Sequence, residues 1–196
     1  NLTVLDLTRV LAGPFCTMML ADMGANVIKI EVPKGGDDTR SYPPFRAKNL
    51  NGERESVYFA NINRNKKGIT LNLKAPEGKE IFKELVKKAD IVVENYRPGV
   101  MDKLGLGYDV LKEINPRIIY AAVSGFGCYG PYHLRPGYDI LAQAMGGMMS
   151  ITGSKGGEPT RAGSALGDIL GGLHVTIGIL AAVNARTITG KGQRVD

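Results

Sequence analysis

Asp168 is the residue of this sequence whose setting most strongly suggests chemistry. It stands in the stretch SALGDILGGLH (164–174), among small and apolar residues near the start of a long apolar segment. Burying an unpaired carboxylate is costly or raises its pKa, so such an aspartate is capped, paired or exposed to a ligand. From the pattern alone, a structural use at the start of a helix, accepting free backbone N–H groups, is favoured over catalysis.

The basic residues of the chain indicate an anionic ligand. The 196 residues carry a net charge of +6, and the sign favours anionic partners. Nucleic acid is disfavoured, because aromatic residues make up only 7% and no helix-turn-helix, zinc or RNA-binding pattern occurs. A phosphorylated small molecule fits scattered loop cations better. We expect RNKK (64–67) to be a solvated loop.

Short apolar runs alternate with longer segments that have helical character. Strands are expected at 2–7, 25–31, 68–73, 91–96 and 117–126, each covered on both faces. Helices are expected at 13–24, 75–89, 138–152 and 164–190, the last largely buried. This order predicts an α/β fold with a Rossmann-like open, mainly parallel sheet and helices on both faces, in one domain over 1–196.

In such sheets, ligands bind beyond the carboxyl ends of the strands. The loops there span 8–14, 31–40, 94–99 and 124–139. They hold Arg9, Lys34, Arg40, Arg97 and Arg135, with Lys103 just beyond them, and so predict a cationic site. No G-x-G-x-x-G follows the first strand, where TRVLAGPF stands instead, and no G-x-x-x-x-G-K-[ST] or G-x-S-x-G occurs. The site is therefore neither an ordinary dinucleotide site nor that of a serine hydrolase.

The cysteines and the hydropathy pattern bear on the setting of the protein. Cys16 and Cys128 lie far apart, which predicts free thiols, a cytoplasmic location and no metal site. No run reaches about 18 uninterrupted apolar residues, and no leader precedes the domain, so we expect no membrane association.

Several separate motifs together resemble the family III CoA-transferases (CaiB/BaiF type). They are LDLTRVLAGPFCTMMLADMGANVIKIE (5–31), GDDTR (36–40), NRNKKGITLNLK (63–74), ADIVVENYRPGVMDKLGLGYD (89–109), NPRIIYAAVSGFG (115–127), GYD (137–139) and ALGDILGG (165–172). The resemblance implies that 1–196 is the N-terminal portion of a CoA-binding large domain. The family's small domain and Gly-rich loop would then lie outside this chain, and the full-length protein would be an interlocked homodimer.

The resemblance also implies roles for individual residues. Asp168 matches the family's nucleophile, with Asp139 assisting it and Tyr138 beside it. Residues expected to contact coenzyme A are Val10, Leu11, Ala12, Asn95, Tyr96, Arg97, Lys103 and Arg135. Leu11 stands where family members often have glutamine, which puts a side-chain hydrogen bond there in doubt. Gly167, Gly171 and Gly172 are expected to leave room for a thioester, and the helix N-terminus to favour ionised Asp168.

The activity implied is transfer of CoA from an acyl-CoA to an acceptor carboxylic acid through an aspartyl mixed anhydride and an aspartyl-CoA thioester, without a metal. The related alpha-methylacyl-CoA racemases carry G-H-D where this chain has GYD (137–139), and a phenol, which titrates near pH 10, is a poor base at neutral pH. Racemase-like isomerisation stays as an alternative. A CoA-binding fragment without turnover is a second one, and a nucleic-acid binder is a distant further one.

Overall fold

The computed structural model describes residues 1–46, 48, 52 and 54–196 and has a six-stranded sheet. Its strands are β1 Thr3–Asp6, β2 Asn26–Glu31, β3 Lys66–Thr70, β4 Ile91–Glu94, β5 Ile119–Ala122 and β6 Arg194–Val195. They lie in the order β3-β2-β1-β4-β5-β6, and every pairing is parallel. The predicted Rossmann-like α/β fold is confirmed.

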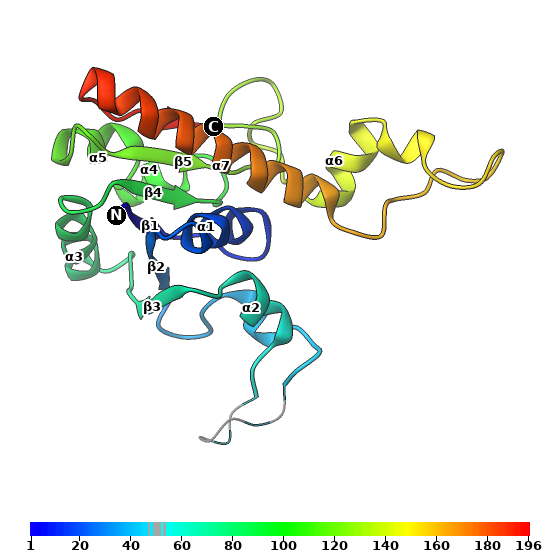
Figure 1. The fold of residues 1–196 in the computed structure, drawn as a ribbon, viewed down its shortest axis with the longest axis horizontal. Helices are drawn as coiled ribbons and strands as arrows, with labels where there is room; N and C mark the ends of the chain where they lie inside the picture. The colour runs from blue at the N-terminus through cyan, green and yellow to red at the C-terminus, as the bar shows by residue number, and fades with distance from the viewer. Residues whose placement is uncertain (47, 49–51, 53) are drawn as a thin grey trace.

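Helices cover both faces of the sheet (Figure 1). They are α1 Ala12–Asp22, α2 Val57–Ile62, α3 Pro76–Val86, α4 Val100–Leu104, α5 Tyr108–Ile114, α6 Asp139–Met145 and α7 Leu166–Thr189, with 3-10 turns at Asp38–Ser41 and Met148–Ile151. One core packs Phe82, Val86 and Leu111 of α3 and α5 against the sheet. The other packs α1 and α7 against the opposite face through Cys16 and Ile179. Alternate residues of each strand supply the two cores, as the pleat requires.

Several elements are shorter or more exposed than the sequence predicts. The third strand begins at Lys66 rather than at residue 68, ends at Thr70 and is mostly exposed, because an edge strand has a neighbour on one side only. The helix expected over 138–152 ends at Met145, since Gly146 and Gly147 follow and Gly147 has a φ of 79°. The short helices α2, α4 and α5 were not predicted, because five to seven residues give too little periodicity.

Helix α7 is less buried than predicted. Only six of its 24 residues are buried: Gly172, Val175, Thr176, Ile179, Ala182 and Arg186. The side chains of Ile177 and Ile188 are exposed on its outer faces. By length and composition α7 is apolar enough to cross a membrane, a criterion that core helices of soluble proteins also meet. The expectation of a largely buried helix is therefore wrong for this chain.

Helices α1 and α7 approach each other closely where both begin. A β-carbon on Gly172 would overlap the carbonyl oxygen of Ala12 in the first turn of α1. Gly171, one residue earlier, has nothing within 4 Å of the same position. Gly172 therefore sets the separation of the two helices, and Gly171 does not.

We expect Gly172→Ala to lower the free energy of unfolding of the full-length protein by about 1–3 kcal/mol, because the added methyl group overpacks the contact between α1 and α7. Gly171→Ala is the matched control, for which helix propensity predicts a gain of up to about 1 kcal/mol. Urea unfolding followed by circular dichroism measures both variants. Equal effects of the two substitutions would contradict a packing role specific to Gly172.

Candidate active site

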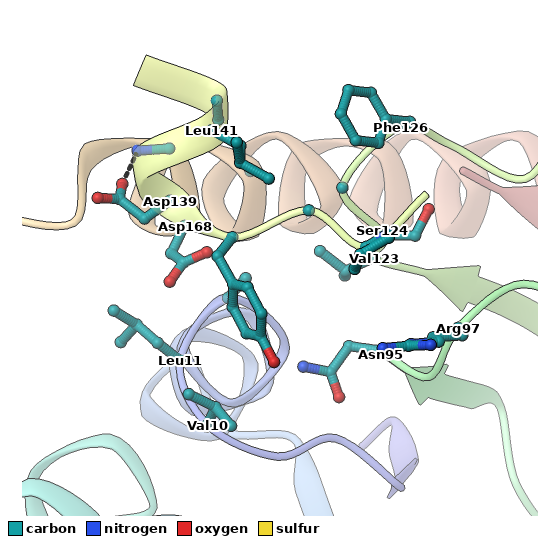
Figure 2. Close-up of a pocket in the computed structure, with 18 of the residues that line it drawn as sticks. Val10, Leu11, Asn95, Arg97, Val123, Ser124, Phe126, Asp139, Leu141 and Asp168 are labelled. Atoms are coloured by element: carbon teal, nitrogen blue, oxygen red, sulfur yellow. Dashed lines mark hydrogen bonds between the residues drawn. The ribbon is translucent and has the colours of Figure 1, made fainter. Parts of the chain in front are cut away.

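A cavity of about 440 Å³ opens at the carboxyl ends of the strands. It lies between the loops that follow β1 and β4, where the order of the strands reverses, as in other open α/β sheets. Its lining comes from residues 9–12, 95–98, 100, 123–126, 135–139, 141–142, 167–168 and 171. Figure 2 shows Val10 and Leu11 on one side of the cavity and Asp139, Asp168 and Leu141 on the other.

Two carboxylates lie together where α6 and α7 begin. Asp168 is the third residue of α7 and is partly buried, and Asp139 is the first residue of α6 and is buried. The backbone N–H of Gly167 donates to Oδ1 of Asp139 at 2.8 Å (Figure 2). The side-chain amide of Gln143 donates to Oδ2 of Asp139, also at 2.8 Å. Asp139 is thus fixed on both oxygens, whereas Asp168 lines the open cavity.

Burial raises the pKa of Asp168, and the neighbouring charge of Asp139 raises it further. Neither of these causes involves the helix end, so the expectation that the helix N-terminus favours the ionised form stays a prediction. Removal from water and a second carboxylate nearby both favour the protonated form. The environment of Asp168 makes its carboxylate more basic than a solvated one.

The three glycines around Asp168 differ in what they do. A β-carbon on Gly167 would press against the side chains of Ala142 and Asp139, so this glycine lets α6 and α7 meet. Gly172 serves the contact with α1 in the same way. Only Gly171 both lines the cavity and has free space beside it. The expectation that all three leave room for a ligand is correct for Gly171 alone.

The turn before α1 forms one wall of the cavity through Val10, Leu11 and Ala12. Asn95 holds this turn: its Oδ1 accepts from the N–H of Arg9 at 2.9 Å, and its Nδ2 donates to the Arg9 carbonyl at 2.7 Å. Both ends of the Asn95 amide are therefore bonded to the backbone of Arg9. The structure places Asn95 at the cavity as expected, with a hold on the neighbouring loop that the sequence did not indicate.

Three arginines line the cavity: Arg9, Arg97 and Arg135. Arg9 forms an exposed ion pair with Asp38 at 3.1 Å. Arg135 lies over the ring of Tyr132, with its guanidinium carbon 4.1 Å from the ring centre. Across the parts of the chain that the structure describes, no carboxylate pairs with Arg97 or Arg135.

Some of the other predicted site residues line the cavity, and others do not. Tyr96 and Tyr138 line the cavity, and Tyr138 is well exposed. Lys103, on α4, is not among the lining residues, and neither are Lys34 and Arg40. Arg40 instead forms a two-bond pair with the buried carboxylate of Glu31. The cationic cavity expected from the sequence is present, with fewer lysines than the loops suggested.

The sequence did not reveal a buried cluster of charges beneath the turn. Lys66 donates to Asp6 at 3.0 Å and Lys29 donates to Asp37 at 2.9 Å, and all four side chains are almost fully buried. Lys66 belongs to the segment 64–67, which was expected to be a solvated loop, and that expectation is wrong for Lys66. The available signal was the lysine in the middle of the apolar run ANVIKIE (25–31).

Two further polar groups near the site also went unrecognised. The hydroxyl of Ser124, a lining residue, is buried and has no hydrogen-bond partner in the described part of the chain. Burial raises the pKa of the Tyr58 phenol on α2, and the nearby charge of Asp168 raises it further. Within residues 1–46, 48, 52 and 54–196, no group of three His, Cys, Asp or Glu residues is arranged to hold a metal ion.

The fold and the cavity together define the class of protein. It is a Rossmann-like domain with a cationic cavity where the order of the strands reverses, and an aspartate with a raised pKa lines this cavity. The family model described as CoA-transferase family III matches residues 1–196, and the chain belongs to that family. Figure 2 shows Asp168, the last residue of the segment ALGD (165–168), at this cavity.

Curated and solved proteins agree with this assignment. The chain is 52% identical to an acyl-CoA transferase of Fusarium pseudograminearum, over 100% of this chain and 44% of that protein. It is 50% identical to the acetyl-CoA:oxalate CoA-transferase of Acetobacter aceti, over 100% and 49%. A crystal structure of a CaiB/BaiF family protein from Brucella suis superposes with a TM-score of 0.95 at 47% identity, over 100% and 51%. The chain spans about half the length of these relatives.

Glu94 lies beneath the loop that carries Asn95 and Tyr96. It accepts from the backbone N–H of Tyr96 at 2.7 Å and from the hydroxyl of Tyr120 at 3.0 Å. Burial raises the pKa of Glu94 to about 7, although both hydrogen bonds and Arg194 lower it in part and Asp102 adds to the rise. The native state therefore binds a proton more tightly than the unfolded chain does.

We expect Glu94→Gln to gain stability relative to the unsubstituted protein as the pH rises from about 4.5 to about 7, by up to about 3 kcal/mol. The sign follows because, over this range, the folded protein keeps the buried carboxyl protonated whereas the unfolded chain ionises it. Folding of the unsubstituted protein therefore takes up a proton and weakens as the pH rises, and the glutamine variant is free of this loss. Urea unfolding of both proteins from pH 4 to 8 measures the difference. A difference that does not change with pH would contradict the raised pKa.

We expect Asp139→Asn to lower the pKa of Asp168, because the substitution removes a neighbouring negative charge while leaving the burial of Asp168 in place. Titration of ¹³C-labelled aspartate carboxyls by NMR measures the shift directly. Asp109→Asn, at an exposed position of α5, is the control and should leave the titration of Asp168 unchanged. An unchanged or higher pKa for Asp168 in Asp139→Asn would contradict this account of the site.

Proposed function

We propose that the full-length protein is a CoA-transferase that moves CoA from an acyl-CoA thioester to a free carboxylic acid, with Asp168 as the nucleophile. The observation that carries the proposal is the Asp168 carboxylate lining a cationic cavity beside the open space at Gly171. Family membership and the named relatives support CoA transfer as the class of reaction.

The lining residues fit coenzyme A. Arg97 and Arg135 have no carboxylate partner in the described residues, so their guanidinium groups are free to meet the phosphates. Val10, Leu11 and Ala12 offer an apolar wall for the pantetheine arm. The space beside Gly171 admits the thioester next to Asp168. A cavity of about 440 Å³ lies within the usual range for small-molecule sites.

The chemistry proceeds as two exchanges at the Asp168 carboxyl. The carboxylate oxygen attacks the thioester carbonyl, the C–S bond breaks, and a mixed anhydride and the CoA thiolate form. The thiolate then attacks the Asp168 carbonyl, which releases the donor acid and leaves an aspartyl-CoA thioester. The acceptor carboxylate attacks the carbonyl of this thioester, the C–S bond breaks, and a second anhydride and the CoA thiolate form. The returning thiolate takes the new acyl group and frees Asp168. No net proton is consumed.

The surroundings of Asp168 suit this role. Burial and Asp139 raise the pKa of Asp168, which makes the ionised carboxylate a better nucleophile. Asp139 is itself fixed by Gly167 and Gln143, so its charge has a constant position relative to Asp168. Tyr138 lines the cavity where the racemases have a histidine, which favours transfer over isomerisation.

The proposal also includes the acceptor, the oligomeric state, the location and the partners expected from the sequence. The acceptor is a carboxylic acid, and the relative from Acetobacter aceti is named for oxalate. An interlocked homodimer is supported by family membership and by exposed apolar side chains on α7, among them Leu170, Ile177, Leu180 and Ile188. A cytoplasmic location is supported by two free cysteines, Cys16 and Cys128. We propose no membrane or nucleic-acid partner and no metal.

We expect the full-length protein, incubated with an acyl-CoA and quenched with hydroxylamine, to carry a hydroxamate on Asp168, because hydroxylamine cleaves both anhydrides and thioesters. Peptide mass spectrometry locates the adduct across a panel of acyl-CoAs. Asp168→Asn and Asp168→Ala should show no adduct and lose CoA transfer.

Asp102→Asn, on α4 outside the cavity lining, is the control and should keep both the adduct and the transfer. The proposal fails if no acyl-CoA gives the adduct. Solvent deuterium appearing at the acyl α-carbon without an adduct would instead establish the racemase-like isomerase.

A further inference from the structure

The turn between β1 and α1 is held almost entirely by side chains from other parts of the chain. Thr8 donates through its N–H and its hydroxyl to Asp6, and its carbonyl accepts from Lys29 Nζ at 2.8 Å. Asn95 bonds both the N–H and the carbonyl of Arg9. The N–H of Val10 donates to Oδ1 of Asp37 at 3.2 Å. The path of this wall of the cavity is therefore set from outside the turn.

Within the turn, the backbone conformation of Val10 is the one that most depends on surrounding contacts. Its φ is 69°, in the left-handed region that a β-branched residue rarely adopts. Such a conformation is strained and persists only where surrounding contacts hold it in place. The acceptor that Asp37 offers to the Val10 N–H is one of those surroundings.

Asp37 is itself locked in place. Its Oδ1 also accepts from the N–H and the hydroxyl of Thr39, at 3.0 and 2.8 Å, and its Oδ2 accepts from Lys29 at 2.9 Å. Its own N–H donates to Glu31 at 2.7 Å, and Arg40 grips the same Glu31. Although burial alone would raise the pKa of Asp37, the Lys29 ammonium and the bonds from Thr39 hold it below its usual value. Asp37 is a fixed, ionised acceptor.

This arrangement reaches the reacting carboxylate through α1. Neither Asp37 nor Lys29 lines the cavity, whereas Val10 and the first turn of α1 do. The Ala12 carbonyl packs directly against Gly172, one helical turn beyond Asp168 on α7. A change in the conformation of Val10 would therefore move the wall that faces Asp168.

We propose that Asp37, paired with the buried Lys29, is a positioning residue for the reaction at Asp168: it holds Val10 in its left-handed conformation and so places the turn 9–12 against the cavity. This assigns a role to the GDDTR segment (36–40), whose side chains stay out of the cavity. The inference rests on the proposed function for its link to catalysis. Its structural part stands on the contacts alone.

The test is a double-mutant cycle in the full-length protein. Lys29→Met/Asp37→Ala removes both buried charges together and deprives the Val10 N–H of its acceptor. Val10→Gly lets position 10 adopt a positive φ without strain. The readouts are kcat and KM for CoA transfer and hydrogen exchange of the amide at position 10.

We expect Lys29→Met/Asp37→Ala to lower kcat/KM by about tenfold or more and to speed exchange of the Val10 amide, since the strained turn relaxes. In the Val10→Gly background the same pair of substitutions should cost several times less. Lys29→Met/Asp37→Asn retains an amide oxygen for the Val10 N–H and should recover most of kcat/KM. A loss that is equal in both backgrounds, or no recovery with asparagine, would overturn the proposal.

Asp90→Asn is the control for stability alone. It breaks the pair between Asp90 and Arg186 at the opposite end of the strands and should show no coupling with Val10→Gly. If the unsubstituted protein gives no hydroxamate at Asp168, the proposed function fails. The exchange measurement still decides the inference in that case, because unaltered exchange at position 10 in Lys29→Met/Asp37→Ala contradicts it.

Discussion

The pairing of buried charges beneath the β1–α1 turn is the constraint on which the site depends. Asp6, Lys29, Asp37 and Lys66 come from β1, β2, the loop after β2 and β3, and they are almost completely removed from water. Charges in such a place are tolerated only when each has its partner and its hydrogen bonds. Burial opposes ionisation of Asp6, yet Lys66 and Lys29 hold its pKa below the usual value. These pairings therefore allow the three strands and the turn only one relative arrangement.

The parallel sheet explains why the chemistry gathers at one edge. All six strands end on the same side, so the loops after β1, β4 and β5 meet there, and the order of the strands reverses between β1 and β4. Helices cannot fill the gap at this reversal, and a ligand cavity is left. Val10, Asn95 and Asp168 reach this cavity from segments that are far apart in sequence (Figure 2).

Close approach of backbones completes the site at the start of α7. Gly167 and Gly172 allow α6 and α1 to pack against this helix on either side of Asp168, while Gly171 stays open to the cavity. The same stretch of small residues therefore allows both tight packing of the helices and access for a ligand. Asp168 is held between helices and is partly buried for that reason, which is also the main cause of its raised pKa.

The pattern of residues was enough to predict the alternation of strands with the longer helices, because hydrophobic periodicity reports directly which faces are buried. The motif ALGD was enough to single out Asp168, since a charge among small apolar residues needs an explanation. The short helices α2, α4 and α5 lay below the length at which periodicity is informative. Exposure of α7 and of β3 depends on which elements lie beside them, and local sequence does not contain that information.

What the sequence alone determined is the class of fold, the edge of the sheet that carries the loops, and Asp168 as a carboxylate at that edge. Only the tertiary structure decided which cations face the cavity, which glycine gives room, and that Lys66 is buried rather than solvated. It also decided that Asn95 and Asp37 act on the backbone of a distant loop. The physical reason is that these properties belong to pairs of residues far apart in the chain. Their distances, and the water between them, are fixed only when the sheet and its helices have assembled.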